Sequence, residues 1–521
     1  HIGNFRTFVF ADIVRRYLAF RGFDVRHIMN ITDVEDKIIR RVNESGKSLA
    51  EFTGEFEQAF FADLEALGCQ LPHVRPHATD FIGPIIKLIK KLEANGIAYK
   101  ANDGSVYFSI EKYRGAGSKY GQLLNINLDE MRPGERVSND EYEKESIADF
   151  ALWKARVPED GDVFWDGPWG EGRPGWHIEC SAMSMELLGP SFDLHLGGED
   201  LVFPHHEDEI AQSEGACAQC DGHKFVKYWM HGAHLLVEGK KMSKSLGNFF
   251  TLRDLLAKGS AGREVRYLMI SAHYRETFNF TLDNLAGAKT ALGRIDECTA
   301  KLRELALGQA AESTTDSPLV MRFTEAMDDD LNVSAAWAAV FDWVRDTNRK
   351  LTANGFTTES AATELANWEH INSVLGIESV EEEAPAEIIA LAEERQDARK
   401  AKDFARSDQI RDELAAALRS RGHRVTGHPL SGVAERAHLA HAGVNLDTHI
   451  TDVLSAIEAN PHDSDIVMVG HSYGGMVITA VADRIPDRLR SLVYLDALVP
   501  QDGESCWDIV NDDERRWYLD L

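Results

Sequence analysis

Lys241-Met-Ser-Lys-Ser245 is a short polar stretch around which the rest of the chain can be placed. The apolar residues 234–237 before it predict a strand, and Thr251 after it predicts the N-cap of a helix. Two lysines on a loop at a strand end suit a polyanionic leaving group such as pyrophosphate, because they stabilise the charge that develops in phosphoryl-type transfer. A solvated lysine loop is the alternative when such a pair stands alone.

The first residues of the chain, His1-Ile-Gly-Asn4, supply a partner for this stretch. Apolar residues at helical spacing follow over 5–20, Gly22 ends the predicted helix, and residues 24–31 predict a buried strand. This order is half of a nucleotide-binding α/β unit, in which free N–H groups at the helix N-terminus attract phosphate. The strand expected before this helix is not in the chain, and the initial His suggests a truncated or processed start.

Together the two stretches resemble the "HIGH" and "KMSKS" motifs of class I aminoacyl-tRNA synthetases, with Asn4 in place of the second His. The surrounding residues, about 1–411, resemble cysteinyl-tRNA synthetases in particular. The resemblance implies activation of cysteine by ATP with Mg²⁺, giving cysteinyl-adenylate, and transfer of the cysteinyl group to tRNA(Cys). The residues it implies for ATP binding and catalysis are His1, Gly3, Asn4, Lys241 and Lys244.

A second constellation combines residues 175–180 with residues 203–209. His205 and Glu209 are four residues apart and share one face of a predicted helix, and Cys180 adds a soft donor from a separate segment. Cys, His and Glu together suit Zn²⁺, although surface His–Glu pairs are common enough to be an equal alternative on spacing alone. The resemblance implies a zinc ion that binds the substrate thiolate, with a fourth Cys ligand that would lie before His1.

The resemblance also implies three residues of the cysteine pocket, which are Thr32, Trp176 and Asp200. Thr32 follows the second predicted strand, and an N-capped turn is its alternative interpretation. A separate Cys217-x-x-Cys220-x-x-His223 pattern could be a metal knuckle, but a variable loop is the simpler interpretation because no fourth ligand is apparent.

The amino-acid composition limits which partners and which cellular compartment we expect. The net charge of −29 argues against non-specific nucleic-acid binding, although a tRNA enzyme can carry local basic patches on an acidic body. Six cysteines at irregular positions predict no disulfide framework, which favours a reducing cytoplasm. No apolar run is long enough to span a membrane. We expect a cytoplasmic, monomeric protein without a membrane partner.

The fold class we expect is α/β, with a Rossmann-like synthetase domain, an inserted connective region, an all-α bundle and a partial α/β-hydrolase segment. Arginines and lysines over residues 393–421 could touch RNA phosphates or form a salt-bridged face with their own acids. The expected parts are the two catalytic halves 1–95 and 151–258, the insertion 96–150, the bundle 259–377, a linker and helix 378–413, and the hydrolase-like segment 414–521.

The last part contains strand, G-x-S-x-G and helix patterns over residues 466–483, which resemble the nucleophile elbow of α/β-hydrolases. Ser472 would be the nucleophile and Asp496 a candidate acid, but no His follows His471 to serve as the base. We expect a hydrolase fragment with a vestigial serine. A serine esterase acting through Ser472, or an inactive synthetase remnant joined to a hydrolase fragment, are the alternatives.

Overall fold

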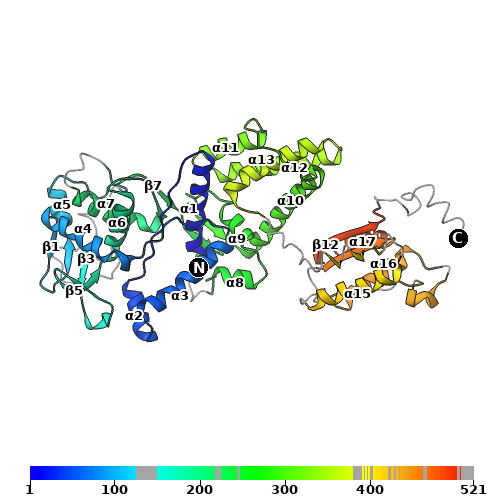
Figure 1. Ribbon diagram of the computed structural model, residues 1–521, viewed down its shortest axis with the longest axis horizontal. Coiled ribbons are helices and arrows are strands. Elements are labelled where there is room, and N and C mark those ends of the chain that lie inside the picture. The colour runs from blue at the N-terminus through cyan, green and yellow to red at the C-terminus, as the bar shows by residue number, and fades with distance from the viewer. Residues whose placement is uncertain are drawn as a thin grey trace. The chain divides into compact units, whose positions relative to one another are not determined.

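The computed structural model describes residues 1–124, 149–217, 224–242 and 247–378. Further along it describes residues 390–391, 394–395, 397–398, 403–420, 424–427, 430–432, 434–441, 443–460, 466–500 and 505. The chain forms two compact units, His1–Val380 and Glu381–Leu521 (Figure 1).

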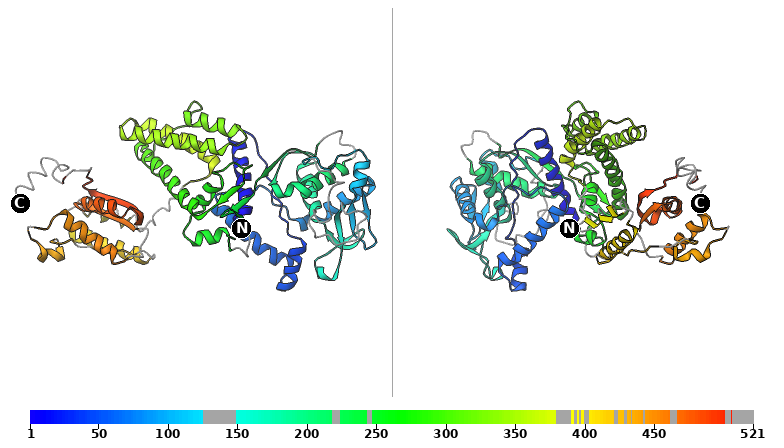
Figure 2. Two further views of the ribbon diagram at one scale, coloured as in Figure 1. Left: turned by 180° about the vertical axis from the view of Figure 1, so that it is seen from behind. Right: turned by 45° about the vertical axis from the view of Figure 1, so that its right-hand side comes forward.

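Helix α1 (Ile2–Phe20) lies at the centre of the first unit. Its apolar side chains, among them Ile2, Val9 and Ile13, are almost completely buried in the largest core cluster. The helix contacts strands and other helices, and the views of Figures 1 and 2 show it beside the green helical bundle. At its end Gly22 has φ +84°, which lets the chain turn where a side chain would be strained.

Residues 24–31 do not form the predicted strand. They make two isolated parallel bridges, Ile28 with Val74 and Ile31 with His77. The amide of Met29 donates to Val74 O (3.1 Å) and that of Ile31 to Pro76 O (2.8 Å). In a continuous parallel ladder residue 76 would donate the bond between these two, but proline has no N–H. The prediction was wrong because this partner segment cannot complete the ladder.

Several short elements of the first unit pack around α1. Two strands with a parallel register, β6 (Phe192–Gly198) and β7 (Val226–Gly232), form one sheet. A second sheet has the order β10 (Phe278–Phe280), β8 (Leu235–Val237) and β9 (Lys240–Lys241). The helices of this part are α2 (Asp36–Ser45), α3 (Leu49–Ala66), α6 (Trp176–Leu188), α7 (Glu207–Ala216), α8 (Leu252–Ala257) and α9 (Gly262–Met269).

Thr251 is the N-cap of α8, as predicted. Its hydroxyl accepts from the amide of Asp254 (3.2 Å), and the Asp254 carboxylate accepts from the amide of Thr251 (2.8 Å). The two bonds form a reciprocal capping box, which fixes where the chain re-enters a helix after the Lys-rich stretch.

A five-stranded sheet forms a separate layer with its own core cluster. The strand order is β1-β2-β3-β5-β4 with antiparallel neighbours, and α4 packs against both α6 and α7. The elements of this layer are α4 (Ile82–Ala94), β1 (Ala98–Lys100), β2 (Val106–Phe108), α5 (Ile110–Gly115), β3 (Phe150–Ala155), β4 (Trp165–Gly167) and β5 (Gly170–Pro174).

Four helices complete the first unit: α10 (Leu282–Ala306), α11 (Pro318–Asp328), α12 (Val333–Thr352) and α13 (Thr358–Leu375). An apolar helical period runs through residues 318–352, but the structure divides them into two helices. Asp330 and Leu331 have positive φ angles of 51° and 57°. Asn332 then caps α12 by accepting from the amide of Ala335 (3.1 Å), so local Asp and Asn chemistry overrides the apolar period.

The second unit contains the predicted strand, turn and helix. Strand β11 (Ile466–Ser472) leads into α17 (Gly474–Arg484) and pairs in parallel with β12 (Leu489–Ala497). A Cβ at Gly470 would lie 2.8 Å from Gly474 O, so the strand and the helix approach too closely for a side chain there. Two further helices are α15 (Phe404–Ser420) and α16 (Leu446–Glu458).

Arg406 of α15 forms ion pairs with Glu394 (2.6 Å) and Glu413 (3.2 Å). These pairs favour the salt-bridged interpretation of this arginine over phosphate binding. The short helical turns of the chain are η1 (Ala78–Phe81), η3 (Pro158–Asp160), η4 (Glu199–Leu201), η5 (Val202–His206), η7 (Ala434–Leu439) and η8 (Pro486–Arg488). Among the helices described here, none combines the length and apolar composition needed to cross a bilayer.

The junction of α3 with α9 yields a stability prediction. A Cβ at Gly262 would lie 1.7 Å from Ala66 O, whereas a Cβ at Gly287 in α10 would meet open space. We expect Gly262→Ala to lower the free energy of unfolding by about 1–3 kcal/mol or more through overpacking. Gly287→Ala should raise it by about 0.5–1 kcal/mol, because alanine favours a helix. Urea denaturation midpoints of the two variants measure this, and an unchanged midpoint for Gly262→Ala would contradict the close approach.

Candidate functional site

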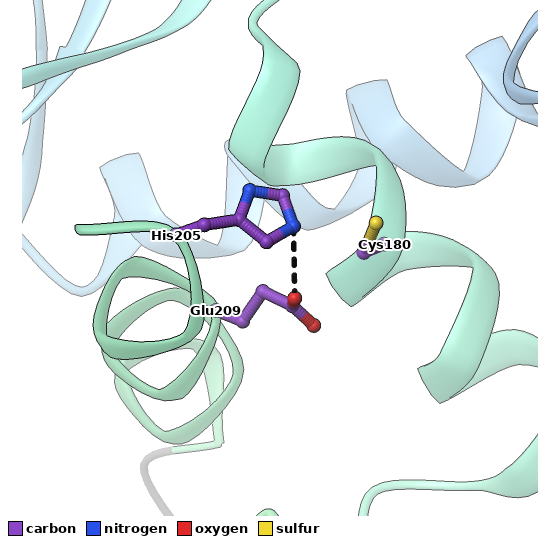
Figure 3. A group of neighbouring side chains, drawn as sticks. All are labelled: Cys180, His205 and Glu209. Carbon is purple, nitrogen blue, oxygen red and sulfur yellow. Dashed lines mark ion pairs between the residues drawn. The ribbon is translucent and has the colours of Figure 1, made fainter. Parts of the chain in front are cut away.

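Three donor groups from two neighbouring helical segments converge in the first unit (Figure 3). One ligand atom each of Cys180, His205 and Glu209 lies within 4.8 Å of the other two. The Nε2 atom of His205 is 3.1 Å from Oε1 of Glu209. His205 lies in η5, just before α7, rather than inside one continuous helix as predicted. The four-residue spacing nevertheless brings its ring over the carboxylate.

Burial and neighbouring charges shift the pKa values of Glu209 and Cys180. Burial raises the pKa of Glu209, but His195 and His205 outweigh it and hold that pKa well below its ordinary value. Burial, with Glu209 and Glu179 nearby, raises the pKa of the Cys180 thiol well above its ordinary value. The site therefore pairs a charged carboxylate with a thiol that ionises only when a cation stabilises it. Sulfur, imidazole and carboxylate donors at this separation fit Zn²⁺.

Further histidines lie beside the donors, and no local sequence pattern indicated their role. His195 Nε2 on β6 is 3.0 Å from Glu209 Oε2, so the carboxylate lies between two imidazoles. His177 Nδ1 is 2.9 Å from His205 Nδ1. Such partners orient metal ligands and set their tautomers. His195 was missed because its role depends on β6 lying beside α7, which no local spacing reveals.

Two of the three expected pocket residues belong to segments at the donor cluster. The ring of Trp176 is 4.6 Å from that of His205, centroid to centroid. The side-chain amide of Asn30 is 3.4 Å from Cys180 Sγ, which places the segment leading to Thr32 beside the cluster. Asp200 is exposed in η4, just past the end of β6. The roles of Thr32, Trp176 and Asp200 in binding a substrate stay predictions.

The start of α1 meets the residues that bracket the Lys-rich stretch. The amide of Ile2 donates to Phe250 O (3.1 Å), and the His1 ring lies edge-on to Phe249 at 5.3 Å. A Cβ at Gly3 would lie 2.6 Å from Cε of Met242. The two motifs are therefore in contact although about 240 residues of sequence separate them.

Of the side chains expected to bind phosphate, the structure describes those of His1, Asn4 and Lys241. Asn4 and Lys241 are exposed, and Lys241 lies in β9. The Asn248 amide is 3.3 Å from Lys241 O and 3.3 Å from Val237 O, which ties the two ends of the stretch together. Lys244 lies outside the described residues, as do Cys220 and His223 of the possible metal knuckle.

The elbow of the second unit has a histidine nearby, but not where a base is needed. His449 Nδ1 is 3.0 Å from the hydroxyl of Tyr473, and its Nε2 is 2.9 Å from Ser431 O. Both ring nitrogens of His449 are thus engaged by groups other than Ser472. Its sequence position before the elbow differs from the order of hydrolase triads, in which the base comes last.

Metal content tests the donor cluster. We expect the purified chain to retain zinc in partial amount after dialysis, because three protein ligands bind more weakly than four. Cys180→Ala should lower zinc affinity at least about tenfold, since it removes the sulfur donor. Cys298→Ala removes a buried thiol of α10 and should leave zinc unchanged. Equal zinc contents in both variants would show that Cys180 is not a ligand.

A fluorophosphonate probe tests Ser472. We expect no labelling, because loss of the base of a catalytic triad lowers turnover by roughly a million-fold. An added active serine hydrolase supplies the positive control. Stoichiometric labelling that disappears in Ser472→Ala would mean that another base activates the serine.

Comparison with known proteins adds to this geometry. Residues 1–290 match the model of the tRNA synthetases class I (C) catalytic domain, residues 322–378 that of the DALR domain, and residues 405–516 that of the alpha/beta hydrolase fold. The cysteine--tRNA ligase of Chlamydia felis is 46% identical over 428 residues, 80% of this chain and 87% of that protein. That of Protochlamydia amoebophila is 44% identical over 422 residues, 79% of this chain and 86% of that protein.

Two solved structures share the fold at low sequence identity. A leucyl-tRNA synthetase complex of Agrobacterium radiobacter superposes with a TM-score of 0.51 at 11% identity, covering 72% of this chain and 81% of that one. Mycobacterium tuberculosis methionyl-tRNA synthetase gives 0.50 at 15%, covering 72% and 87%. The contact between the two motifs, the catalytic-domain match over more than half of the chain and the curated relatives agree: the chain belongs to the cysteine--tRNA ligase family of class I aminoacyl-tRNA synthetases.

Proposed function

We propose that this chain joins L-cysteine to tRNA(Cys) at the expense of ATP. The observation that carries the proposal is the convergence of a thiol, an imidazole and a carboxylate at Cys180, His205 and Glu209. Such a donor set selects a soft ligand atom, and among the amino acids the cysteine side chain offers a thiolate. The curated relatives of Chlamydia felis and Protochlamydia amoebophila, both named cysteine--tRNA ligases, support the same substrate.

The reaction has two steps. First a carboxylate oxygen of cysteine attacks the α-phosphorus of ATP, and the bond from that phosphorus to the bridging oxygen breaks, releasing pyrophosphate. Then a terminal ribose hydroxyl of the tRNA attacks the adenylate carbonyl, and AMP leaves as the ester forms. Neither step needs a covalent enzyme intermediate, so the protein contributes positioning and charge stabilisation.

The residues of the two motifs divide this work. His1, Gly3 and Asn4 stand at the N-terminus of α1, where the positive end of the helix dipole favours the triphosphate of ATP-Mg²⁺. Lys241 and Lys244 neutralise the charge that accumulates on the departing phosphates. Contact between the motifs through Gly3 and Met242 lets one end of the nucleotide site respond to the other.

Cys180, His205 and Glu209 would hold Zn²⁺, which supplies a soft Lewis acid for the sulfur of cysteine. His195 orients Glu209, and Trp176 packs beside His205. Thr32 and Asp200 contact the rest of the amino acid. Serine nearly matches cysteine in shape, so selection by donor softness discriminates between them where a steric pocket cannot. We place the enzyme in a reducing cytoplasm, because its cysteine substrate must carry a free thiol. We expect it to be a monomer.

Cysteine-dependent exchange of pyrophosphate into ATP tests the first step. We expect the chain to support exchange with cysteine and not with serine. Lys244→Ala should reduce exchange by about a hundredfold or more while sparing cysteine binding, because the lysine acts on charge that develops in the transition state. Lys240→Ala, an exposed neighbour in β9, is the matched control. Equal exchange rates in wild type and Lys244→Ala would refute the role.

A further inference from the structure

We propose that the buried Arg266–Asp12 ion pair is a positioning pair that couples the DALR domain to helix α1, so that transfer to tRNA depends on it more strongly than cysteine activation does. The inference rests on the proposed function. Neither residue belongs to the two motifs or to the donor cluster, and both act through the elements they join.

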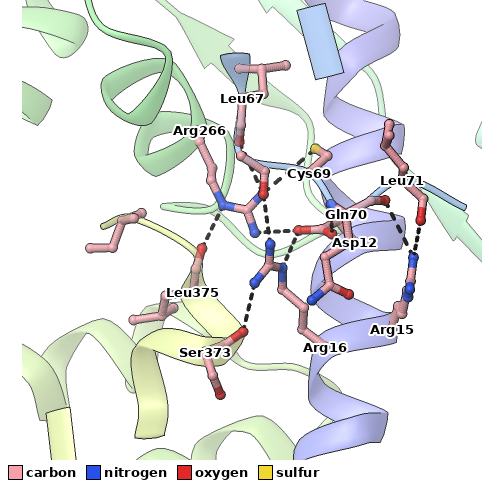
Figure 4. A network of polar contacts seen from close by, with 12 residues as sticks. Asp12, Arg15, Arg16, Leu67, Cys69, Gln70, Leu71, Arg266, Ser373 and Leu375 are labelled. Carbon is pink, nitrogen blue, oxygen red and sulfur yellow. Dashed lines mark hydrogen bonds and ion pairs between the residues drawn. The ribbon is translucent and has the colours of Figure 1, made fainter. Parts of the chain in front are cut away.

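Arg266 is completely buried on α9, and its guanidinium contacts three separate segments (Figure 4). Its Nη2 is 2.6 Å from Asp12 Oδ2, on α1. Its Nε donates to Leu375 O (2.6 Å), at the end of α13. Its Nη1 donates to Leu67 O (3.2 Å), at the end of α3. The guanidinium of Arg266, on α9, therefore contacts α1, the end of α3 and the end of α13.

Asp12 completes the junction from the side of α1. It is 3% exposed, and its Oδ1 accepts from the amide of Gln70 (2.8 Å). Its Oδ2 also accepts from Nε of Arg16 (2.7 Å). Arg16 in turn donates to Ser373 O (2.9 Å) and Gly68 O (2.8 Å), so it spans the same two helix ends as Arg266.

Electrostatics explains why two arginines gather here. The C-termini of α3 and α13 each present carbonyl oxygens and the negative end of a helix dipole. Together with the Asp12 carboxylate they form a buried concentration of negative charge that two guanidinium groups offset. Removing one partner would leave the others buried and unpaired, which is strongly unfavourable. Lysine cannot replace Arg266 here, because a single ammonium cannot serve three directions as a planar fork does.

The backbone is also fitted to this side chain. Gly376 follows α13 with φ +63°, and a Cβ there would lie 2.9 Å from Nη2 of Arg266. The last turn of α13 therefore passes directly over the guanidinium. Its position is set by the ion pair rather than by apolar packing alone.

The helices that Arg266 and Asp12 join carry the proposed nucleotide site and part of the DALR match. Helix α1 carries the phosphate-binding residues at its start, and α9 follows the Lys-rich stretch through α8. Helix α13 lies within the DALR match, residues 322–378. Loss of the pair would free the end of α13 relative to α1, while the start of α1 keeps its separate hydrogen bond to Phe250 O.

The bundle has independent attachments, so loss of the pair loosens it without detaching it. The Tyr17 hydroxyl donates to Asp328 (2.7 Å), and the Phe20 ring stacks on that of His370 at 4.4 Å. Removing the pair should change the orientation of α13 while the remaining contacts hold the bundle against α1. The activation site, supported by its own sheets and donor cluster, should change less.

The test uses Asp12→Asn and Arg266→Lys in the full chain. We expect kcat/KM for aminoacylation of a tRNA(Cys) transcript to fall at least about tenfold, within the range of coupled sites, and cysteine-dependent pyrophosphate exchange to change less than about threefold. Hydrogen exchange at amides 371–378 should increase, while that of α4 and α7 stays unchanged. Arg173→Lys is the matched control, because Arg173 is also buried (4% exposed) and pairs with Asp36 and with Asp160 (3.0 Å), neither of which belongs to the bundle.

The outcomes separate the two proposals. Absence of cysteine-dependent exchange in the wild type, with a folded chain, refutes the proposed function and with it the coupling. Equal losses of exchange and aminoacylation in the Asp12 and Arg266 variants mean that the pair is only structural, and overturn the inference alone. If these variants fail to fold, Arg16→Lys, at the partly exposed edge of the junction, must show the same selective loss; unchanged aminoacylation in it would overturn the inference as well.

Discussion

Burial of helix α1 is the constraint on which the first unit depends. The helix is covered by strands, by α9 and by α13, so its apolar side chains form the centre of the core while its polar ones must find partners inside the protein. Asp12 does so through Arg266 and Arg16. The start of the same helix contacts Phe249 and Phe250, just after the Lys-rich stretch. One helix therefore supplies the core, the domain junction and the expected phosphate site.

The donor cluster follows the same physical rule at a second place. A buried carboxylate is costly unless charged or hydrogen-bonded partners surround it, and Glu209 lies between His195 and His205. A metal bound there, as we propose, would replace these partners by stronger ones. His195, hydrogen-bonded to Glu209, would then orient one of the ligands.

Local chemistry in the sequence predicted several elements, and non-local contacts decided the rest. Thr251 and Asp254 encode their capping box within four residues, and the elbow at Ser472 needs only its own strand and helix. The strand over 24–31 failed because Pro76, fifty residues away, lacks the N–H that would complete the ladder. The break after Asp328 was encoded locally, in Asn332 and its acidic neighbours, but the apolar period concealed it. His195 could not be found because its partner Glu209 lies on another element.

In the second unit, contacts between neighbouring parts of the chain are sufficient to form the strand, turn and helix of the elbow. Gly470 and Gly475 allow α17 to cross β11 and β12 closely, since a Cβ at either position would meet backbone atoms within 2.8 Å. These contacts shape an elbow within residues 466–497. Catalysis by such an elbow needs in addition a base, an acid that orients it and oxyanion donors, which come from distant parts of a complete fold. The ring nitrogens of His449 lie within hydrogen-bonding distance of the Tyr473 hydroxyl and of Ser431 O. A well-formed turn therefore shows local folding and does not by itself show hydrolysis. In the first unit, distant segments converge at the donor cluster and at the contact between the two motifs.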